Sequence, residues 1–280
     1  MAPRSVLLVA LALGMSRSSF VDTTALIMGA MDGRNKLAPA AAAFHAASSG
    51  PRPQALLAAE GVELDWDPGA SKSYAGASGV DLPEWTATAK PLEEVILSRE
   101  SRRGYSGESI PLAQISMMLN LGYGVVRKDG GDFARRVAPS AGGLYPLEMY
   151  LFSFRVEGLP GGLFHYQRDR HRLEQLNAFD RRTPLGPIFG DLVDFSSMSA
   201  LMVISAVFSR STRKYGDRGY RFALLEAGHL AQNLLLTAEG LRLGAVPLGG
   251  FHDDMVNRLL GVDGEAEAAV HAVAIGGRCP

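Results

Sequence analysis

Two short stretches of the chain carry groups that suit an anionic ligand with a flat ring. Residues 99–105 read Arg-Glu-Ser-Arg-Arg-Gly-Tyr, and residues 139–146 read Pro-Ser-Ala-Gly-Gly-Leu-Tyr-Pro. Arginine presents a planar fork of donors that matches phosphate oxygens, and three guanidinium groups surround the hydroxyl of Ser101. The first stretch therefore suits a phosphate monoester. Taken alone, it is also compatible with a solvated surface loop.

The second stretch presents backbone rather than side chains. Gly142 and Gly143 leave no side chain between the main chain and a flat ligand, and Ser140 adds one hydroxyl. Backbone amides can then contact a ring directly, which favours a ring-binding loop. A turn without a ligand is the alternative for this stretch alone.

Lys214 and Tyr215 form the best candidate for a catalytic pair. Residues 209–221 hold five lysines or arginines against one aspartate, so the local charge is strongly positive. Repulsion from Arg213 and Arg218 disfavours a further positive charge on Lys214, and the neutral amine is the form that acts as a base. A basic surface loop is the alternative interpretation.

Polar residues interrupt the strongest helix pattern of the chain, which covers residues 219–239. They are Glu226, His229, Gln232 and Asn233. Burying such a side chain without a partner costs about 1–3 kcal/mol, so we expect each of them to meet a partner. The first two are expected to bond within the fold. Gln232 and Asn233 are candidates for facing a cofactor or a second copy of the chain.

The segment 245–251, Ala-Val-Pro-Leu-Gly-Gly-Phe, is another place with bare backbone. The amides of Gly249 and Gly250 can approach a ring closely, and a flavin needs a donor beside N5, where a proton and charge arrive on reduction. Arg278, near the end of the sequence, can add a cation to a phosphate site. A Pro-Gly turn and a frayed terminus are the alternatives.

Composition argues against several classes of protein. Lys and Arg total 28 against 29 Asp and Glu, which leaves a net charge of −1 and no overall field for nucleic acid or an anionic membrane. Cys279 is the one cysteine, which excludes an intrachain disulfide, a cysteine-based zinc site and an iron–sulfur cluster. The histidines show no ligand spacing, so we expect no metal site.

A single cysteine fits a reducing compartment, and we expect a cytoplasmic protein. Residues 6–13 form an apolar run like that of a short signal peptide, but no convincing cleavage site follows it, and export is the alternative. The run is also too short to span a bilayer, which takes about 20 residues.

Hydrophobic periodicity places the candidate residues on an α+β frame. We interpret residues 1–90 as an amino-terminal extension and lead-in segment, followed by one domain over residues 91–280. Helices are expected over residues 91–98, 111–121 and 219–239. Strands are expected over residues 147–154, 162–166, 172–176, 200–208, 244–251 and 270–276, the second and third of them as a hairpin. The sequence therefore predicts a mixed sheet with helices packed around it.

The order of the motifs resembles the nitroreductase-like flavoproteins, and within them the SagB-type azoline dehydrogenases. The matching stretches are Arg-x-Ser-x-Arg-x-Tyr at 99–105, Pro-Ser-Ala-Gly-Gly-Leu-Tyr-Pro-Leu-Glu at 139–148, Gly-Leu-x-His-Tyr at 162–166, Lys214-Tyr215, Gly228-His229-x-x-Gln232-Asn233 and Pro-x-Gly-Gly-Phe at 247–251. The resemblance covers residues 40–278 in matching order, and residues 1–38 fall outside it.

The resemblance implies the nitroreductase-like fold, with a mainly antiparallel sheet surrounded by helices and FMN bound at the interface of a homodimer. It implies that Arg99 and Arg278 hold the FMN phosphate, that Ser101 and Arg103 contact the phosphoribityl or pyrimidine side, and that Gly250 directs its amide to N5. The remaining implied flavin contacts are Pro139, Ser140, Gly142, Gln232, Asn233 and Gly249.

The reaction implied by the resemblance is oxidation of a thiazoline or oxazoline in a peptide to the thiazole or oxazole, with Lys214 and Tyr215 as the acid–base pair. The substrate would be a ribosomal precursor peptide or a chain on a carrier protein, made by a cyclodehydratase or a synthetase. Two other hypotheses stay open. One is an NAD(P)H-dependent nitro or quinone reductase on the same fold, and the other is a flavin-less scaffold that binds a peptide.

Overall fold

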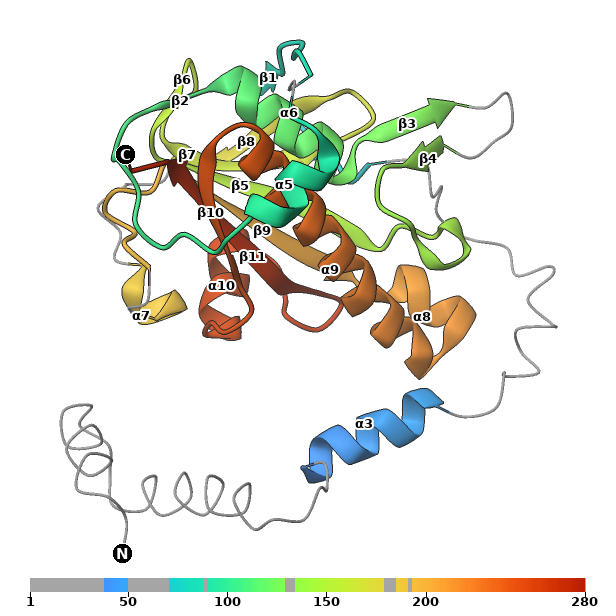
Figure 1. The fold of residues 1–280 in the computed structure, drawn as a ribbon. Helices are drawn as coiled ribbons and strands as arrows, with labels where there is room; N and C mark the ends of the chain where they lie inside the picture. Colours follow the sequence, from blue (N-terminus) through green and yellow to red (C-terminus); the bar gives the residue numbers. More distant parts are fainter. Residues whose placement is uncertain are drawn as a thin grey trace, which may run out of the picture. The chain divides into compact units, whose positions relative to one another are not determined.

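The computed structural model describes residues 38–49, 71–87, 90–128, 134–178, 185–190 and 193–279 (Figure 1). The chain divides into two compact units, Met1–Gly50 and Pro51–Pro280. In the first unit, α3 (Pro39–Ser49) is an alanine-rich helix. The signal-like run at 6–13 and the Pro/Gly segment at 50–53 lie outside the described residues.

Seven strands of the second unit form one sheet in the order β1-β8-β7-β5-β9-β11-β10, and all of its neighbours are antiparallel. They are β1 (Gly79–Asp81), β5 (Leu147–Ser153), β7 (Gly162–Gln167), β8 (Arg172–Asn177), β9 (Ala200–Val207), β10 (Leu243–Leu248) and β11 (Glu267–Gly277). Two small pairs lie apart from it: β2 (Ile110–Pro111) runs parallel to β6 (Val156–Glu157), and β3 (Val125–Lys128) runs antiparallel to β4 (Ala134–Arg136). The expected mainly antiparallel sheet is therefore confirmed.

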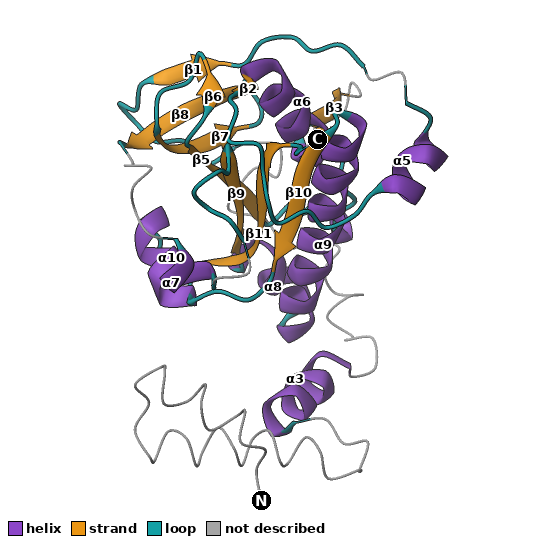
Figure 2. Cartoon of the chain, turned by 60° about the vertical axis from the view of Figure 1, so that its left-hand side comes forward, coloured by secondary structure: helices purple, strands orange, loops and turns teal. Residues whose placement is uncertain are grey.

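Helices cover both faces of this sheet. They are α5 (Leu92–Ser98), α6 (Leu112–Tyr123), α7 (Gly186–Phe189), α8 (Ser209–Tyr215), α9 (Asp217–Gly240) and α10 (Asp253–Leu260). Figure 2 shows α6 and α9 on one face of the sheet and α7 and α10 on the other. The predicted α+β class is confirmed. No helix in the described part of the chain has both the length and the apolar character that crossing a bilayer requires.

Strand β5 shows how the sequence separates the two faces. Met149 and Leu151 pack into the core under α6 and α9, whereas Tyr150 and Phe152 pack into the core beside α7 and α10. Successive side chains of a strand point to opposite faces, which explains this division. The same alternation puts Glu148 on the face of Tyr150, where a carboxylate needs partners because all of β5 is buried.

The lead-in segment contributes to the same sheet. Strand β1 pairs with β8, and Leu82 belongs to the core under α6. No strand is predicted here from the sequence, because three residues give too short an alternation to be recognised. Residues 79–82 thus fold with the sheet of the domain predicted over 91–280.

Candidate functional site

The arginine-rich stretch runs along the free edge of the sheet at β10. The N–H of Arg102 donates a hydrogen bond to the carbonyl of Ala245 (2.9 Å), and the N–H of Ser106 donates one to the carbonyl of Gly277 (2.9 Å). Tyr105 packs on Gly276, where an added Cβ would lie 2.7 Å from the Tyr105 Cγ. The stretch that holds Arg99, Ser101 and Arg103 is therefore fixed beside the end of β11, which leads into Arg278.

Arg278 is held by a buried carboxylate at the end of α9. Glu239 accepts hydrogen bonds from Arg278, from the Lys90 Nζ (2.9 Å) and from the Ser98 Oγ (2.8 Å). Burial tends to raise the pKa of Glu239, but these donors hold it below its usual value. The carboxylate thus stays charged and fixes two cations side by side.

These cations line a cavity of about 560 Å³ with a third, Arg242. Arg242 has a φ of 59°, in the left-handed region that side chains rarely adopt. The Nε of Arg278 is buried and has no hydrogen-bond partner among the described residues. This donor set suits a phosphate monoester.

Sequence reasoning missed Lys90, Arg242 and Glu239. Neither cation belongs to a recognisable motif. Glu239 did carry a signal, because a carboxylate in the last turn of a helix opposes the helix dipole and so indicates a specific cationic partner.

The ring-binding loop and the predicted catalytic pair lie in contact. Gly142, in the short helix η1 (Ala141–Gly143), has a φ of 66° and lies against Tyr215. A Cβ at this position would overlap the Tyr215 Oη and would come 3.3 Å from the Lys214 Nζ. Glycine is therefore required here both for its backbone conformation and for the close approach.

A cavity of about 520 Å³ opens at the same loop. Its lining includes Pro139, Ser140 and Gly142, three of the predicted flavin contacts. Burial raises the pKa of the Tyr215 hydroxyl, and the Lys214 Nζ lies 5.5 Å from the centre of the Tyr215 ring. An amine and a phenol therefore lie together beside Gly142, one of the residues that line this cavity.

Glu226 of α9 holds this loop through a hydrogen bond with Ser140. The Tyr123 Oη donates a hydrogen bond to Glu226 (2.6 Å), the Ser140 hydroxyl donates another, and the Tyr145 N–H donates to the Ser140 Oγ (2.9 Å). Burial raises the pKa of Glu226 to about 7. The partner that the sequence predicted for Glu226 is thus found inside the fold.

We expect Glu226→Gln to remove a pH-dependent loss of stability. Because the folded-state pKa is about 7 and the ordinary value is 4.5, the folded protein keeps a proton that the unfolded chain releases between these values. Wild-type stability therefore falls, relative to the neutral variant, as the pH rises from 4.5 to about 7. The full difference is about 3 kcal/mol. Urea unfolding of both proteins at several pH values measures it.

Glu93→Gln is the control, because Glu93 is exposed on α5. Its stability difference from wild type should show no comparable step across this pH range. A Glu226→Gln difference that does not change with pH would contradict the assignment.

The two groups of candidate residues lie at opposite ends of α9. Tyr215 comes just before Asp217, the first residue of α9, whereas Glu239 binds Arg278 at the last turn. The Ser140 hydroxyl of the Gly142 loop bonds Glu226, which precedes Glu239 by 13 residues, so at 1.5 Å per residue about 20 Å of helix lies between the two groups. Within one chain, the Gly142 group and the Arg278 group are therefore separate.

The remaining candidates lie on exposed surface. A Cβ at Gly249 or Gly250, just after β10, would meet no atom within 4 Å. Gln232 is exposed and Asn233 is half-buried on α9. His229 is also exposed, so the expectation that it bonds within the fold is wrong.

Large apolar side chains are exposed on α9, the helix that holds Gln232 and Asn233, and on α5. They are Leu92, Ile96 and Leu97 of α5 and Tyr220, Leu224 and Leu225 of α9. Leu97 is 86 % exposed and Leu225 is 55 % exposed. Because Ser98 of α5 bonds Glu239, 14 residues after Leu225, the two sets lie toward opposite ends of α9.

A further cavity lies elsewhere. It measures about 660 Å³ and is lined by residues 74–78 and 175–178 with Leu260 and Gly261, none of which is a predicted site residue. We therefore assign no chemistry to it. Within the described ranges, no group of His, Cys, Asp and Glu is arranged to hold a metal ion.

Comparison with known proteins gives a family match over most of this unit. A family model described as "Nitroreductase family" matches residues 96–277. The chain is 34 % identical over 169 residues to MJ1384 of Methanocaldococcus jannaschii, a protein assigned to the nitroreductases, covering 60 % of this chain and 83 % of that protein. It is 30 % identical over 134 residues to the microcin B17-processing protein McbC of Escherichia coli, covering 46 % of this chain and 49 % of McbC. The chain thus spans about half the length of McbC.

Solved structures agree on the fold. A protein of Ralstonia eutropha assigned to the nitroreductases matches with a TM-score of 0.62 and 27 % identity, covering 79 % of this chain and 98 % of that one. A chain from the E. coli microcin synthetase McbBCD complex with truncated pro-MccB17 bound matches with a TM-score of 0.54 and 23 % identity, covering 83 % and 84 %.

Proposed function

Because the chain belongs to the nitroreductase family, we propose that it is an FMN-dependent dehydrogenase that oxidises thiazolines or oxazolines in a peptide to thiazoles or oxazoles. The observation that carries the proposal is the contact of Gly142 with Lys214 and Tyr215. It brings a potential base to a loop of bare backbone, and removal of a proton from an azoline ring requires such a base.

The residues present fit FMN. The cations Lys90, Arg242 and Arg278 suit its phosphate, and the unpartnered Nε of Arg278 leaves a donor for it. The bare backbone at Gly142 and at residues 249–250 suits its ring. When bound, the flavin would accept two electrons and one hydrogen from the azoline. Arg99, Ser101, Arg103, Gln232 and Asn233 are further proposed contacts.

Two copies of the chain complete each site in this proposal. About 20 Å of α9 lies between Glu226, which bonds the Ser140 hydroxyl of the Gly142 loop, and Glu239, which binds Arg278. One copy would supply the cations, and its partner would supply Gly142, Lys214 and Tyr215. The exposed apolar side chains of α5 and α9 support an interface between copies.

Lys214 and Tyr215 act as the acid–base pair. The Lys214 amine takes the acidic proton of the azoline ring, and the Tyr215 hydroxyl, whose pKa burial raises, donates a hydrogen bond at the same place. The substrate ring gains aromaticity, which drives the reaction forward. Gly142 keeps the space in front of both groups clear.

The names of two similar proteins support the substrate class. McbC is described as microcin B17-processing, and the microcin synthetase complex holds a truncated pro-MccB17. That likeness supports a peptide substrate, ribosomal or carrier-bound, and a cyclodehydratase or synthetase partner. A cytoplasmic location stays an expectation from the single cysteine.

A second candidate is an NAD(P)H-dependent nitro or quinone reductase, which the 34 % identity to MJ1384 favours. The two functions differ in what reduces the flavin. We expect anaerobic mixing with a synthetic thiazoline peptide to bleach the flavin, and NAD(P)H to bleach it slowly. Rapid bleaching by NAD(P)H alone would support the reductase. Purified protein that is colourless and takes up no FMN would support the flavin-less scaffold.

We expect Arg278→Met to weaken FMN binding about 10- to 100-fold, because a charge-assisted hydrogen bond to the phosphate is lost. Riboflavin has the same ring but no phosphate, so its affinity should change little. Flavin fluorescence titrations of wild type and variant measure both affinities. An equal loss for FMN and riboflavin would contradict a phosphate role for Arg278.

A further inference from the structure

We propose that Glu148 is a positioning residue that holds α8 through Arg210, so that Lys214 and Tyr215 stay in contact with Gly142. The inference rests on the proposed function, because it concerns the same catalytic pair. It adds a residue that does not touch the substrate or the flavin but sets the geometry of the residues that do.

Glu148 is fully buried and has three polar partners. Its Oε1 accepts a hydrogen bond from the Arg210 Nη1 at 2.6 Å. Its Oε2 accepts one from the Arg168 Nη1 at 2.6 Å and lies 3.1 Å from the His165 Nε2. Burial alone would raise the pKa of Glu148, but His165 and Arg210 hold it below its usual value. The carboxylate is therefore charged and fixed from two sides.

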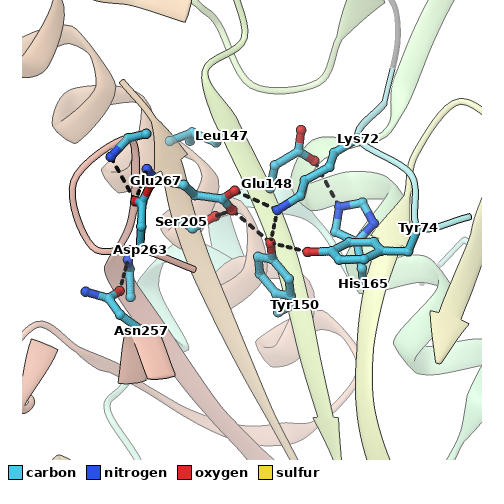
Figure 3. A network of polar contacts seen from close by, with 12 residues as sticks. Lys72, Tyr74, Leu147, Glu148, Tyr150, His165, Ser205, Asn257, Asp263 and Glu267 are labelled. Atoms are coloured by element: carbon cyan, nitrogen blue, oxygen red, sulfur yellow. Dashed lines mark hydrogen bonds and ion pairs between the residues drawn. The ribbon is translucent and has the colours of Figure 1, made fainter. Parts of the chain in front are cut away.

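The position of Glu148 on β5 makes it a firm anchor. Figure 3 shows Glu148 and His165 joined on one face of the sheet, and the other ring nitrogen of His165 lies 3.1 Å from Glu174 on β8. The carboxylate thus belongs to a network that crosses three neighbouring strands. Arg210 is its partner from α8.

Helix α8 depends on such an anchor. It has seven residues, and no side chain caps its N-terminus. A helix this short is not stable by itself in water. Arg210 precedes Lys214 by four residues, so the two side chains lie on one side of α8. Fixing Arg210 on the sheet therefore fixes the direction in which Lys214 projects.

Glu148 also follows the ring-binding loop directly in the sequence. It lies six positions after Gly142 and is the second residue of β5, the strand that the loop enters. One side chain therefore connects the loop that holds Gly142 with the helix that holds Lys214 and Tyr215. A displacement of about 1 Å between catalytic groups can cost about 100-fold in rate, so this connection is expected to matter for turnover.

Glu148→Gln tests the proposal, because glutamine keeps the size of the side chain and removes its charge. The matched control is Glu267→Gln. Glu267 is a buried carboxylate on the same sheet face, bonded to Lys72 (2.6 Å), Tyr150 (2.8 Å) and Ser205 (2.6 Å), with no bond to α8 (Figure 3). Both variants lose a buried ion pair, but we expect α8 to loosen in Glu148→Gln alone.

We expect Glu148→Gln to lower kcat about tenfold or more while KM and FMN affinity change about twofold at most. Backbone amides of residues 209–215 should also exchange hydrogen faster in the FMN-loaded variant, by mass spectrometry. Glu267→Gln should lower the thermal midpoint and leave both kcat and the exchange of α8 unchanged. If Glu148→Gln fails to fold, Arg210→Met removes the same bond and leaves Glu148 with Arg168 and His165.

Unchanged exchange in α8 would overturn the proposal, as would an equal loss of kcat in both glutamine variants. The exchange measurement needs no substrate. If wild-type protein oxidises no azoline but α8 still loosens in Glu148→Gln, the proposed reaction fails and the anchoring of α8 stands.

Discussion

The Lys214→Ala variant is expected to keep its flavin absorbance and to lose azole formation. A positioned base contributes about 10²- to 10⁴-fold to a proton transfer, so turnover should fall within that range. Lys214 lies beside Gly142 and is not among the cations that line the proposed phosphate site, so FMN affinity should change little. Turnover with a synthetic thiazoline peptide and a flavin titration measure the two effects.

Two further variants separate base catalysis from charge. Lys214→Arg keeps a positive charge but cannot act as a base near neutral pH, so it should be nearly as inactive as the alanine variant. Arg258→Ala removes an exposed positive charge from α10, on the other face of the sheet from α9, and should retain most of the turnover. Normal turnover in Lys214→Ala would remove the catalytic assignment.

Gly142→Ala is expected to lower kcat about 100-fold, because the new methyl group displaces the catalytic pair. The Cβ would overlap the Tyr215 Oη and come 3.3 Å from the Lys214 Nζ. Part of the effect will come from backbone strain, since φ at this residue is 66°. Steady-state kinetics on the FMN-loaded protein give the change.

Gly143→Ala isolates the contact from the strain. Gly143 has a φ of 68°, almost that of Gly142, but the nearest atom to its added Cβ is the Tyr145 Cε2 at 4.0 Å. Both variants should lose similar stability, and Gly142→Ala should lose about tenfold more turnover. Equal turnover in the two would mean that the contact with Lys214 and Tyr215 has no catalytic role.

The elements with strong patterns were predictable. The apolar run at 200–208 is the buried strand β9, and the pattern at 219–239 is helix α9. The hairpin expected from residues 162–176 forms as β7 and β8. In each case, local periodicity and tertiary packing favour the same structure, and for that reason the sequence alone was sufficient.

Helix α8 was not predictable, because its stability is not local. Residues 209–215 read Ser-Arg-Ser-Thr-Arg-Lys-Tyr, which contains no apolar stripe, and the sequence favoured a basic loop. The helix is held by the Arg210–Glu148 bond and by the packing of Tyr215 on Phe222, whose rings lie 5.0 Å apart. Glu148 is distant in the sequence and Phe222 belongs to the next helix, so the residues of α8 alone reveal neither partner.

The candidate site likewise contains some residues that sequence motifs predict and others that only the fold brings together. The motifs identified Gly142, Lys214 and Tyr215, which the fold brings into contact. They could not identify Lys90 or Arg242, because these cations join Arg278 through the packing of α5 and β10 against α9. The flavin contacts assigned to Arg99, Ser101 and Arg103 stay predictions.

Anaerobic mixing of the FMN-loaded protein with a synthetic thiazoline peptide tests the central claim most directly. The account predicts that the yellow colour bleaches in a single turnover and that the peptide loses two hydrogens, as measured by mass spectrometry. Protein that binds FMN and is bleached by NAD(P)H, but leaves both its colour and the peptide mass unchanged in this mixture, would contradict it.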